Sequence, residues 1–214
     1  MNVPCKICNK RRARRNCPGV GGEICPQCCG TERENTVDCP HDCEHLQAAR
    51  LHEQPAPIAS TEIPNQDIRV TEDFIRQHEN VITWLTVALA SAIEKERAVD
   101  FDAREALDAL IRTYRTLESG LIYETRPQNP FAAAIQEALR KSVDELRQEL
   151  ARESRMHSLR DAEILGALVF LQRLELQHNN GRRRGRAFFD FLRAYFPSQL
   201  SPQTPPAAAQ LIQP

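Results

Sequence analysis

The stretch CKICNKRRARRNCPGVGGEICPQCCGTERENTVDCPHDCEHL, residues 5–46, holds all eight cysteines of this 214-residue chain. Two of its cysteine pairs, Cys5/Cys8 and Cys25/Cys28, have the C-x-x-C spacing that lets two thiolates converge on one ion at about 2.3 Å. No apolar leader-like run precedes Cys5, so we expect reduced thiols and a cytoplasmic protein. The pattern therefore predicts a zinc-binding module rather than a set of disulfides.

Two closed tetrahedral sites need eight ligands, and we expect two structural Zn²⁺ ions. One ion would be held by a first set of ligands, which comprises Cys5, Cys8, Cys25 and Cys28. The second would be held by Cys17, Cys39, Cys43 and either Cys29 or His45. A single site, or another partition of the same ligands, remains an alternative. His41 is expected to be a solvated neighbour.

Zinc would supply most of the folding energy of this segment, because its apolar residues are few. They are Ile7, Val20, Ile24, Val37 and Leu46. A structural zinc ion contributes about 10–16 kcal/mol in finger peptides, which is ample to fold such a piece.

The cysteine order of residues 5–45 resembles that of cross-brace zinc fingers of the B-box and HIT types. The B-box ligand usually found between the positions of Cys17 and Cys25 is absent here, so the ligand partition stays open. The resemblance implies interleaved structural zinc sites in a module that contacts proteins. The stretch CCGTERENTVDCP, residues 28–40, is similar to bacterial zinc-finger proteins.

The remainder of the chain is expected to be mainly α-helical, and four segments are delimited by composition. Residues 1–50 form the cysteine-rich module, 53–68 a proline-containing linker, 69–196 a bundle of four to five helices, and 197–214 a disordered proline-rich tail.

Several helix ends in residues 69–196 are marked by capping residues. We expect N-caps at Thr71, at Asn129 before Pro130 and at Ser158, a capping box at Asp102 with Glu105, and a stop at Asn180-Gly181. A short fifth helix would span 188–196, and its aromatic residues would close the bundle rather than form a dimer. The oligomeric state itself stays open.

Charge is unevenly distributed, with +2 over residues 1–50, −7 over 51–178 and +4 over 179–214. A dedicated nucleic-acid binder would carry a broader cationic field. Two basic clusters nevertheless form candidate phosphate contacts. They are Lys10, Arg11, Arg12, Arg14 and Arg15, and Arg182, Arg183, Arg184 and Arg186. The alternative is that the first cluster offsets thiolate charge and the second pairs with the acidic bundle.

We find no catalytic motif. The sequence has no H-E-x-x-H, Walker loop or nucleophile elbow, and the thiolates suffice to close both sites. The most apolar run, Val81–Ile93, has 13 residues, whereas a membrane span needs about 20. The sequence thus predicts a non-catalytic zinc-binding adaptor that contacts an unidentified protein partner, with a nucleic-acid-associated regulator as the alternative.

Overall fold

The computed structural model describes residues 3–53, 58–153 and 159–195. In chain order, the described elements are strands β1 (Arg15–Cys17) and β2 (Gly22–Ile24), helices α1 (Pro26–Glu32) and α2 (Glu44–Arg50), the 3₁₀ turn η1 (Ser60–Glu62), and helices α3 (Glu72–Gln77), α4 (Glu79–Glu96), α5 (Asp100–Glu118), α6 (Pro130–Glu153), α7 (Asp161–His178) and α8 (Ala187–Tyr195). The expected fold class, a small cysteine-rich module followed by a helical bundle, is confirmed.

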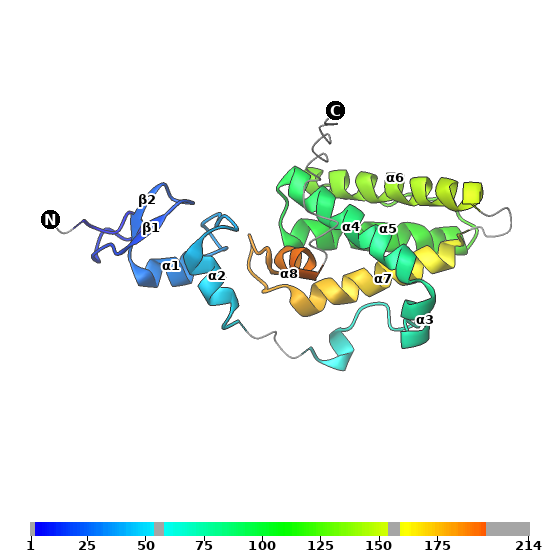
Figure 1. Cartoon of the computed structure of the whole chain (residues 1–214), viewed down its shortest axis with the longest axis horizontal. Helices are drawn as coiled ribbons and strands as arrows, with labels where there is room; N and C mark the ends of the chain where they lie inside the picture. The colour runs from blue at the N-terminus through cyan, green and yellow to red at the C-terminus, as the bar shows by residue number, and fades with distance from the viewer. Residues whose placement is uncertain (1–2, 54–57, 154–158, 196–214) are drawn as a thin grey trace, which may run out of the picture.

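The N-terminal module comprises β1, β2, α1 and α2 (Figure 1). The two strands form an antiparallel ladder that pairs Arg15 with Ile24 and Cys17 with Gly22. Ile24 and Leu46 are almost fully buried among the cysteines. All five apolar residues singled out from the sequence belong to this small core. Its size explains why side-chain packing alone is a weak source of stability here.

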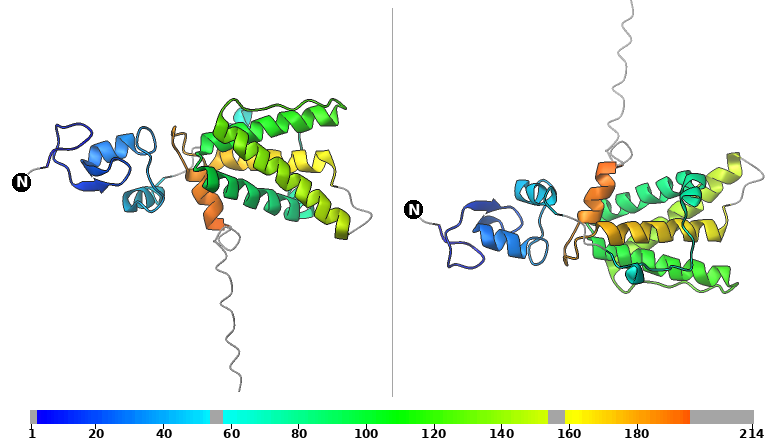
Figure 2. Two further views of the ribbon diagram at one scale, coloured as in Figure 1. Left: turned by 90° about the horizontal axis from the view of Figure 1, so that it is seen from above. Right: turned by 90° about the horizontal axis from the view of Figure 1, so that it is seen from below.

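Helices α4 to α7 form the body of the bundle (Figure 2). Helix α4 packs on α6 and α7, and α5 packs on α6 and α7. Helix α8 lies across one end, against α4, α5 and α7. The buried side chains recur at helical spacing, as in Leu85, Leu89 and Ile93 of α4, each fully buried. That periodicity is what allowed the sequence to predict the bundle.

Some helix boundaries differ from the expectation. Thr71 caps α3, because its hydroxyl accepts from Phe74 N at 3.2 Å, but the helix breaks at His78 and restarts as α4. Helix α5 begins at Asp100, so Asp102 lies inside its first turn and accepts from Val99 N at 2.9 Å. The capping box expected at Asp102 and Glu105 was therefore misplaced.

The ends of the later helices follow the sequence more closely. Asn129 caps α6 as predicted, with Phe131 N donating to its Oδ1 at 3.0 Å. Helix α7 ends at His178, just before the Asn180-Gly181 stop that was expected. Ser158 lies outside the described residues.

Helix α8 is capped from a distance by Asp100. Phe188 N and Phe189 N donate to its two carboxylate oxygens at 3.0 and 3.2 Å. Phe188 and Phe189 are buried in the bundle core, as the aromatic content of this segment predicted. Helix α8 is therefore capped by a side chain of α5 rather than by a local residue.

The segment between module and bundle is partly fixed to the bundle. Arg173 of α7 donates to the carbonyl oxygens of Asn65 at 2.7 Å and Ile68 at 3.0 Å. Residues 54–57 of the expected linker and the expected tail lie outside the described residues. Among the helices that the structure describes, none is long and apolar enough to cross a membrane.

Candidate metal centre

Four cysteines converge in the N-terminal module. The Sγ atoms of Cys5, Cys8, Cys25 and Cys28 all lie within 4.8 Å of one another. Cys5, Cys25 and Cys28 are buried, and Cys8 is half-buried. This is the first ligand set that the sequence predicted, and the cluster could bind one metal ion.

The backbone presents N–H groups to these sulfurs. Cys25 N donates to Cys5 Sγ at 3.2 Å, and Cys28 N donates to Cys25 Sγ at 3.4 Å. Cys25 is the N-cap of α1, with Pro26 at the first helical position. The other pair is closed by a turn in which Asn9 N donates to Cys5 O at 2.8 Å and Asn9 adopts a φ of 52°. Each C-x-x-C pair is thus shaped by backbone hydrogen bonds before any metal is considered.

Without a metal, the thiols of this cluster differ in their pKa. Burial disfavours the Cys5 thiolate, but the backbone N–H groups of Cys8, Cys25 and Ile7 outweigh it and lower the Cys5 pKa to about 6. Burial and hydrogen bonds with the neighbouring thiols raise the pKa of Cys28 to about 12. A divalent cation would offset the raised pKa, because it lowers the pKa of every thiol that it coordinates. The electrostatics of the cluster therefore suit a metal.

The second predicted ligand set lies around one small cavity of about 20 Å³. Its candidate ligands all line that cavity, and they are Cys17, Cys29, Cys39, Cys43 and His45. Burial is the largest cause that raises the pKa of Cys39, and the charges of Glu34, Cys17 and Cys43 add to it. Within the described part of the chain, only the first set has its ligand atoms within 4.8 Å of one another. A second metal site is therefore not evident from the geometry.

The choice between Cys29 and His45 is informed by their neighbours. Cys29 Sγ accepts from Arg15 Nη1 at 3.3 Å and from Arg33 Nη2 at 3.8 Å. His45 Nε2 lies 3.6 Å from the exposed carboxylate of Glu44. Two guanidinium groups thus already contact the Cys29 sulfur, whereas His45 has an exposed carboxylate beside it.

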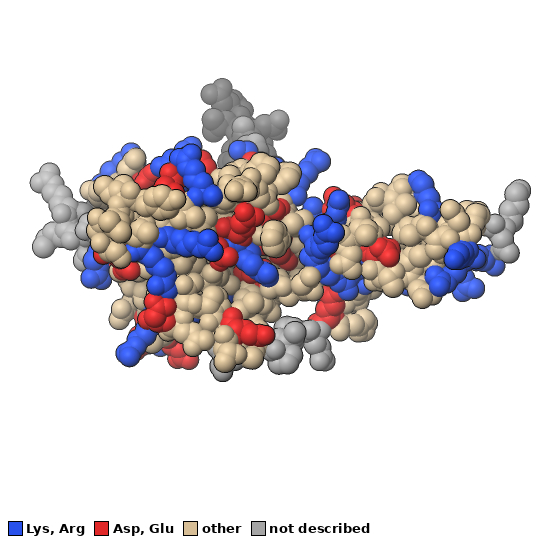
Figure 3. Space-filling model, turned by 180° about the vertical axis from the view of Figure 1, so that it is seen from behind, with Lys and Arg blue, Asp and Glu red and all other residues tan. Residues whose placement is uncertain are grey.

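The first basic cluster is divided between the cysteines and solvent. Arg15 contacts Cys29, and a hydrogen bond with the Cys25 side chain raises the pKa of Arg11. Lys10, Arg12 and Arg14 are exposed. Figure 3 shows Lys and Arg side chains gathered at the outer end of the module. Part of this cluster therefore contacts cysteine side chains, and part of it faces solvent.

The second basic cluster lies where the module meets the bundle. Arg186 Nη1 lies 2.5 Å from Asp38 Oδ1, and Arg182 Nη1 donates to Arg33 O at 3.0 Å. Arg184 N donates to Glu34 O at 2.7 Å. The side chains of Arg183 and Arg184 are the exposed members of the cluster. Two of its four arginines thus hold the module against the bundle through their side chains, and Arg184 does so through its backbone.

Glu34 is the centre of this contact, which the sequence did not predict. Its carboxylate is 1% exposed and accepts from Arg50 Nη2 at 2.6 Å, Asn180 Nδ2 at 2.8 Å and Arg186 N at 3.1 Å. Its backbone has a φ of 52°, in the left-handed region. No sequence motif distinguishes a single glutamate in a turn. The role of Glu34 is seen only in the folded chain, where it contacts Asn180 and Arg186, which lie 146 and 152 positions further along the sequence.

A second contact joins α2 and the preceding loop to α8. His41 Nδ1 lies 2.7 Å from Asp190 Oδ1, and its ring packs edge-on against Phe189 with centroids 5.2 Å apart. Arg50 Nε lies 3.3 Å from Asp190 Oδ2. His41 is therefore not the solvated neighbour that the sequence suggested, because it contacts the bundle.

Comparisons with known proteins add nothing to this geometry: no family model, no curated protein and no solved structure matches the chain.

Proposed function

We propose that this chain is a non-catalytic zinc-binding interaction protein, in which zinc is structural and the helical domain contacts a protein partner. The observation that carries the proposal is the four-thiol cluster of Cys5, Cys8, Cys25 and Cys28. Four soft thiolates at this spacing suit Zn²⁺ and fill its tetrahedral shell. A catalytic zinc site keeps a position open for water, and a four-cysteine shell leaves none.

A second zinc ion would occupy the small cavity lined by the remaining cysteines. Binding would draw Cys17, Cys39 and Cys43 together, since cysteines in zinc sites place sulfur about 2.3 Å from the ion. We assign the fourth position to Cys29. Two arginines already donate hydrogen bonds to its sulfur, and they would act as outer-shell donors to a bound thiolate.

Native mass spectrometry of the full chain tests both ions. We expect two zinc ions per chain, with one lost in Cys5→Ser and one lost in Cys39→Ser, so that each variant serves as the control for the other. Cys29→Ala should also lose one ion, whereas His45→Ala should keep both. A metal-free chain with four disulfides would refute the zinc proposal, and a wild-type chain that holds one ion and keeps it in Cys39→Ser would limit the proposal to the first site.

The surface offers one support for a protein partner. Leu121, Ile122 and Tyr123 are consecutive in the segment that joins α5 and α6, and they are 63%, 97% and 66% exposed. Consecutive large apolar side chains in solvent are costly, and such patches commonly mark protein contacts.

Quantitative affinity capture tests this contact. Proteins retained by the wild type should be lost with Ile122→Asp and kept with Gln148→Asp, which introduces the same residue at an exposed position of α6. Equal recovery with both variants would exclude this segment as the contact.

The exposed part of the first basic cluster favours a second candidate, a nucleic-acid-associated regulator. Lys10, Arg12 and Arg14 have no ion pair with a carboxylate in the described part of the chain. Three phosphate contacts would give a slope of log affinity against log salt of about −3 on duplex DNA. An anisotropy titration with DNA and RNA at low and high salt measures this slope. Absence of binding at low salt would eliminate this candidate.

A further inference from the structure

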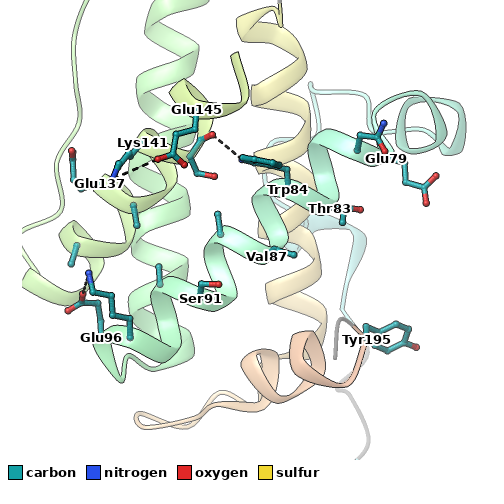
Figure 4. A pocket seen from close by; sticks show the side chains of 17 residues that line it. Glu79, Thr83, Trp84, Val87, Ser91, Glu96, Glu137, Lys141, Glu145 and Tyr195 are labelled. Carbon is teal, nitrogen blue, oxygen red and sulfur yellow. Dashed lines mark hydrogen bonds and ion pairs between the residues drawn. The ribbon is translucent and has the colours of Figure 1, made fainter. Parts of the chain in front are cut away.

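A long groove runs between α4 and α6 on the bundle surface (Figure 4). Its volume is about 1320 Å³. Small side chains of both helices line it, among them Ala88, Ala92, Ala134 and Ala138. Small residues leave room for a further segment to approach the two helices closely. The groove therefore has the size and the lining of a site for a peptide segment rather than for a small ion.

Trp84 is the most prominent side chain of this groove. It is 39% exposed, and its indole Nε1 donates to Ser142 O of α6 at 3.0 Å. This hydrogen bond fixes the ring across the groove, so that its apolar face is preorganised for contact. An aromatic ring held in this way is a strong apolar anchor for a bound segment.

The charges along the groove are largely paired among neighbours on the same helices. Lys141 Nζ lies 3.8 Å from Glu145 Oε1, and Lys95 Nζ lies 3.9 Å from Glu96 Oε1. Glu137 is paired with Arg140 at 2.6 Å. Because these groups already have partners, a bound segment need not bring charge. The groove is thus best matched by an uncharged, partly apolar peptide.

Such a peptide follows directly in this chain. Tyr195, the last described residue, is 70% exposed and lines the groove. Residues 196–214 carry no charged side chain, and 207–212 read AAAQLI, without proline. The 12 steps from Tyr195 to Ala207 can span about 40 Å when extended. Helix α4, with 18 residues, is about 27 Å long. The whole groove is therefore within reach.

We propose that residues 207–212 of this chain occupy the α4–α6 groove, with Leu211 and Ile212 packed near Trp84. The attachment is intramolecular, so even a weakly binding segment is held at an effective concentration of about millimolar. Any external ligand of this groove must then displace the chain's own C-terminal segment. This inference does not depend on the metal or on the proposed protein partner.

Trp84 supplies a direct readout, because it is the single tryptophan of the chain. Removing residues 199–214 should shift its emission to longer wavelength and increase its quenching by acrylamide. A synthetic peptide of residues 199–214 should reverse both effects when it is titrated into the truncated chain. The helical circular dichroism of the bundle should be retained after the truncation, because helices α3 to α8 all end before residue 199.

Point variants of the full chain make the test specific. The double variant Leu211→Asp/Ile212→Asp should reproduce the fluorescence of the truncated chain, whereas Gln213→Asp should resemble the wild type. Identical emission and quenching in the full and truncated chains would overturn the proposal. A protein-concentration dependence of the shift, with a dimer mass by light scattering, would also overturn it by making a second copy the occupant.

Discussion

Replacing Glu34 with Ala should release the cysteine-rich module from the bundle while leaving each of them folded. Glu34 is the buried acceptor that joins three groups: Arg50 of the module, and Asn180 and the Arg186 N–H of the bundle. It lies at the turn after α1 rather than in the metal cluster. Its loss should therefore affect docking before it affects metal binding.

The size of the effect follows from the donors that are left behind. Arg50 still has two carboxylate partners, Glu53 Oε2 at 3.0 Å and Asp190 Oδ2 at 3.3 Å, so its charge is not left unpaired. Asn180 Nδ2 and Arg186 N lose their acceptor, and each unsatisfied buried donor costs about 1–3 kcal/mol. We therefore expect a loss of about 3 kcal/mol, near the lower end of the range for breaking a buried ion pair. Glu34→Gln keeps one acceptor oxygen and should lose less.

Urea unfolding with two simultaneous signals measures this coupling. Trp84 fluorescence follows the bundle, and zinc release to a colorimetric chelator follows the module. In the wild type the docked parts should unfold together, whereas in Glu34→Ala the two transitions should separate. Glu23→Ala, which removes an exposed carboxylate from β2, is the matched control and should behave as the wild type.

Two results would refute the reasoning. If Glu34→Ala unfolds with the wild-type midpoint and with coincident signals, the buried carboxylate does not hold the module in place. If the variant loses its zinc in the absence of denaturant, Glu34 supports the metal site rather than the docking.

Three further perturbations address other parts of the molecule. Burial raises the pKa of Asp100 to about 7, so the folded chain holds that proton more tightly than the unfolded chain does, and stability should fall as pH rises from about 4 to 7. The pKa difference corresponds to about 4 kcal/mol. The unfolding free energy of the wild type, relative to that of Asp100→Asn, should therefore fall as pH rises across that range. A gap between the two proteins that stays constant with pH would contradict the raised pKa. A Cβ on Gly166 would lie 2.4 Å from the ring of Phe74, so Gly166→Ala should destabilise by about 1–3 kcal/mol despite its better helix propensity. Thermal melts should show recovery in the Phe74→Leu background, and equal losses in both backgrounds would argue against the clash. Removal of zinc by a strong chelator should unfold the module and leave the helical circular dichroism of the bundle nearly intact; a cooperative loss of both would mean that the bundle needs the module.

Local signals in the sequence were sufficient to predict the helical bundle and the first set of four cysteines. The repeat of Leu85, Leu89 and Ile93 predicts a buried helix face wherever it occurs, and the geometry of a C-x-x-C pair is set within a few residues. The break at His78 was missed because the apolar repeat continues across it from Phe74 to Val81. Asp102 was taken for a cap because the true N-cap, Val99, has no side-chain acceptor.

Long-range contacts carried no comparable signal. Arg182 and Arg186 were candidates for phosphate binding. A cluster of arginines in the sequence does not reveal whether its partner is a phosphate or, as here, the module's Arg33 carbonyl and Asp38 carboxylate. Asp100 looked like a helix-start residue, yet it also caps a helix 88 positions away. Such pairings depend on tertiary packing, and no periodicity in the sequence records them.

The distance along the chain between Glu34 and the residues that it binds sets an order of events during synthesis. The bundle side of the docking contact is made about 150 residues after the module. At a translation rate of about 5–20 residues per second, the module waits roughly 8–30 s for that surface. During this interval its thiols are available to metal ions without the bundle beside them. Metal binding can therefore precede docking on the nascent chain. In a module without metal, Glu34 would lie in an unfolded segment when Arg186 is synthesised.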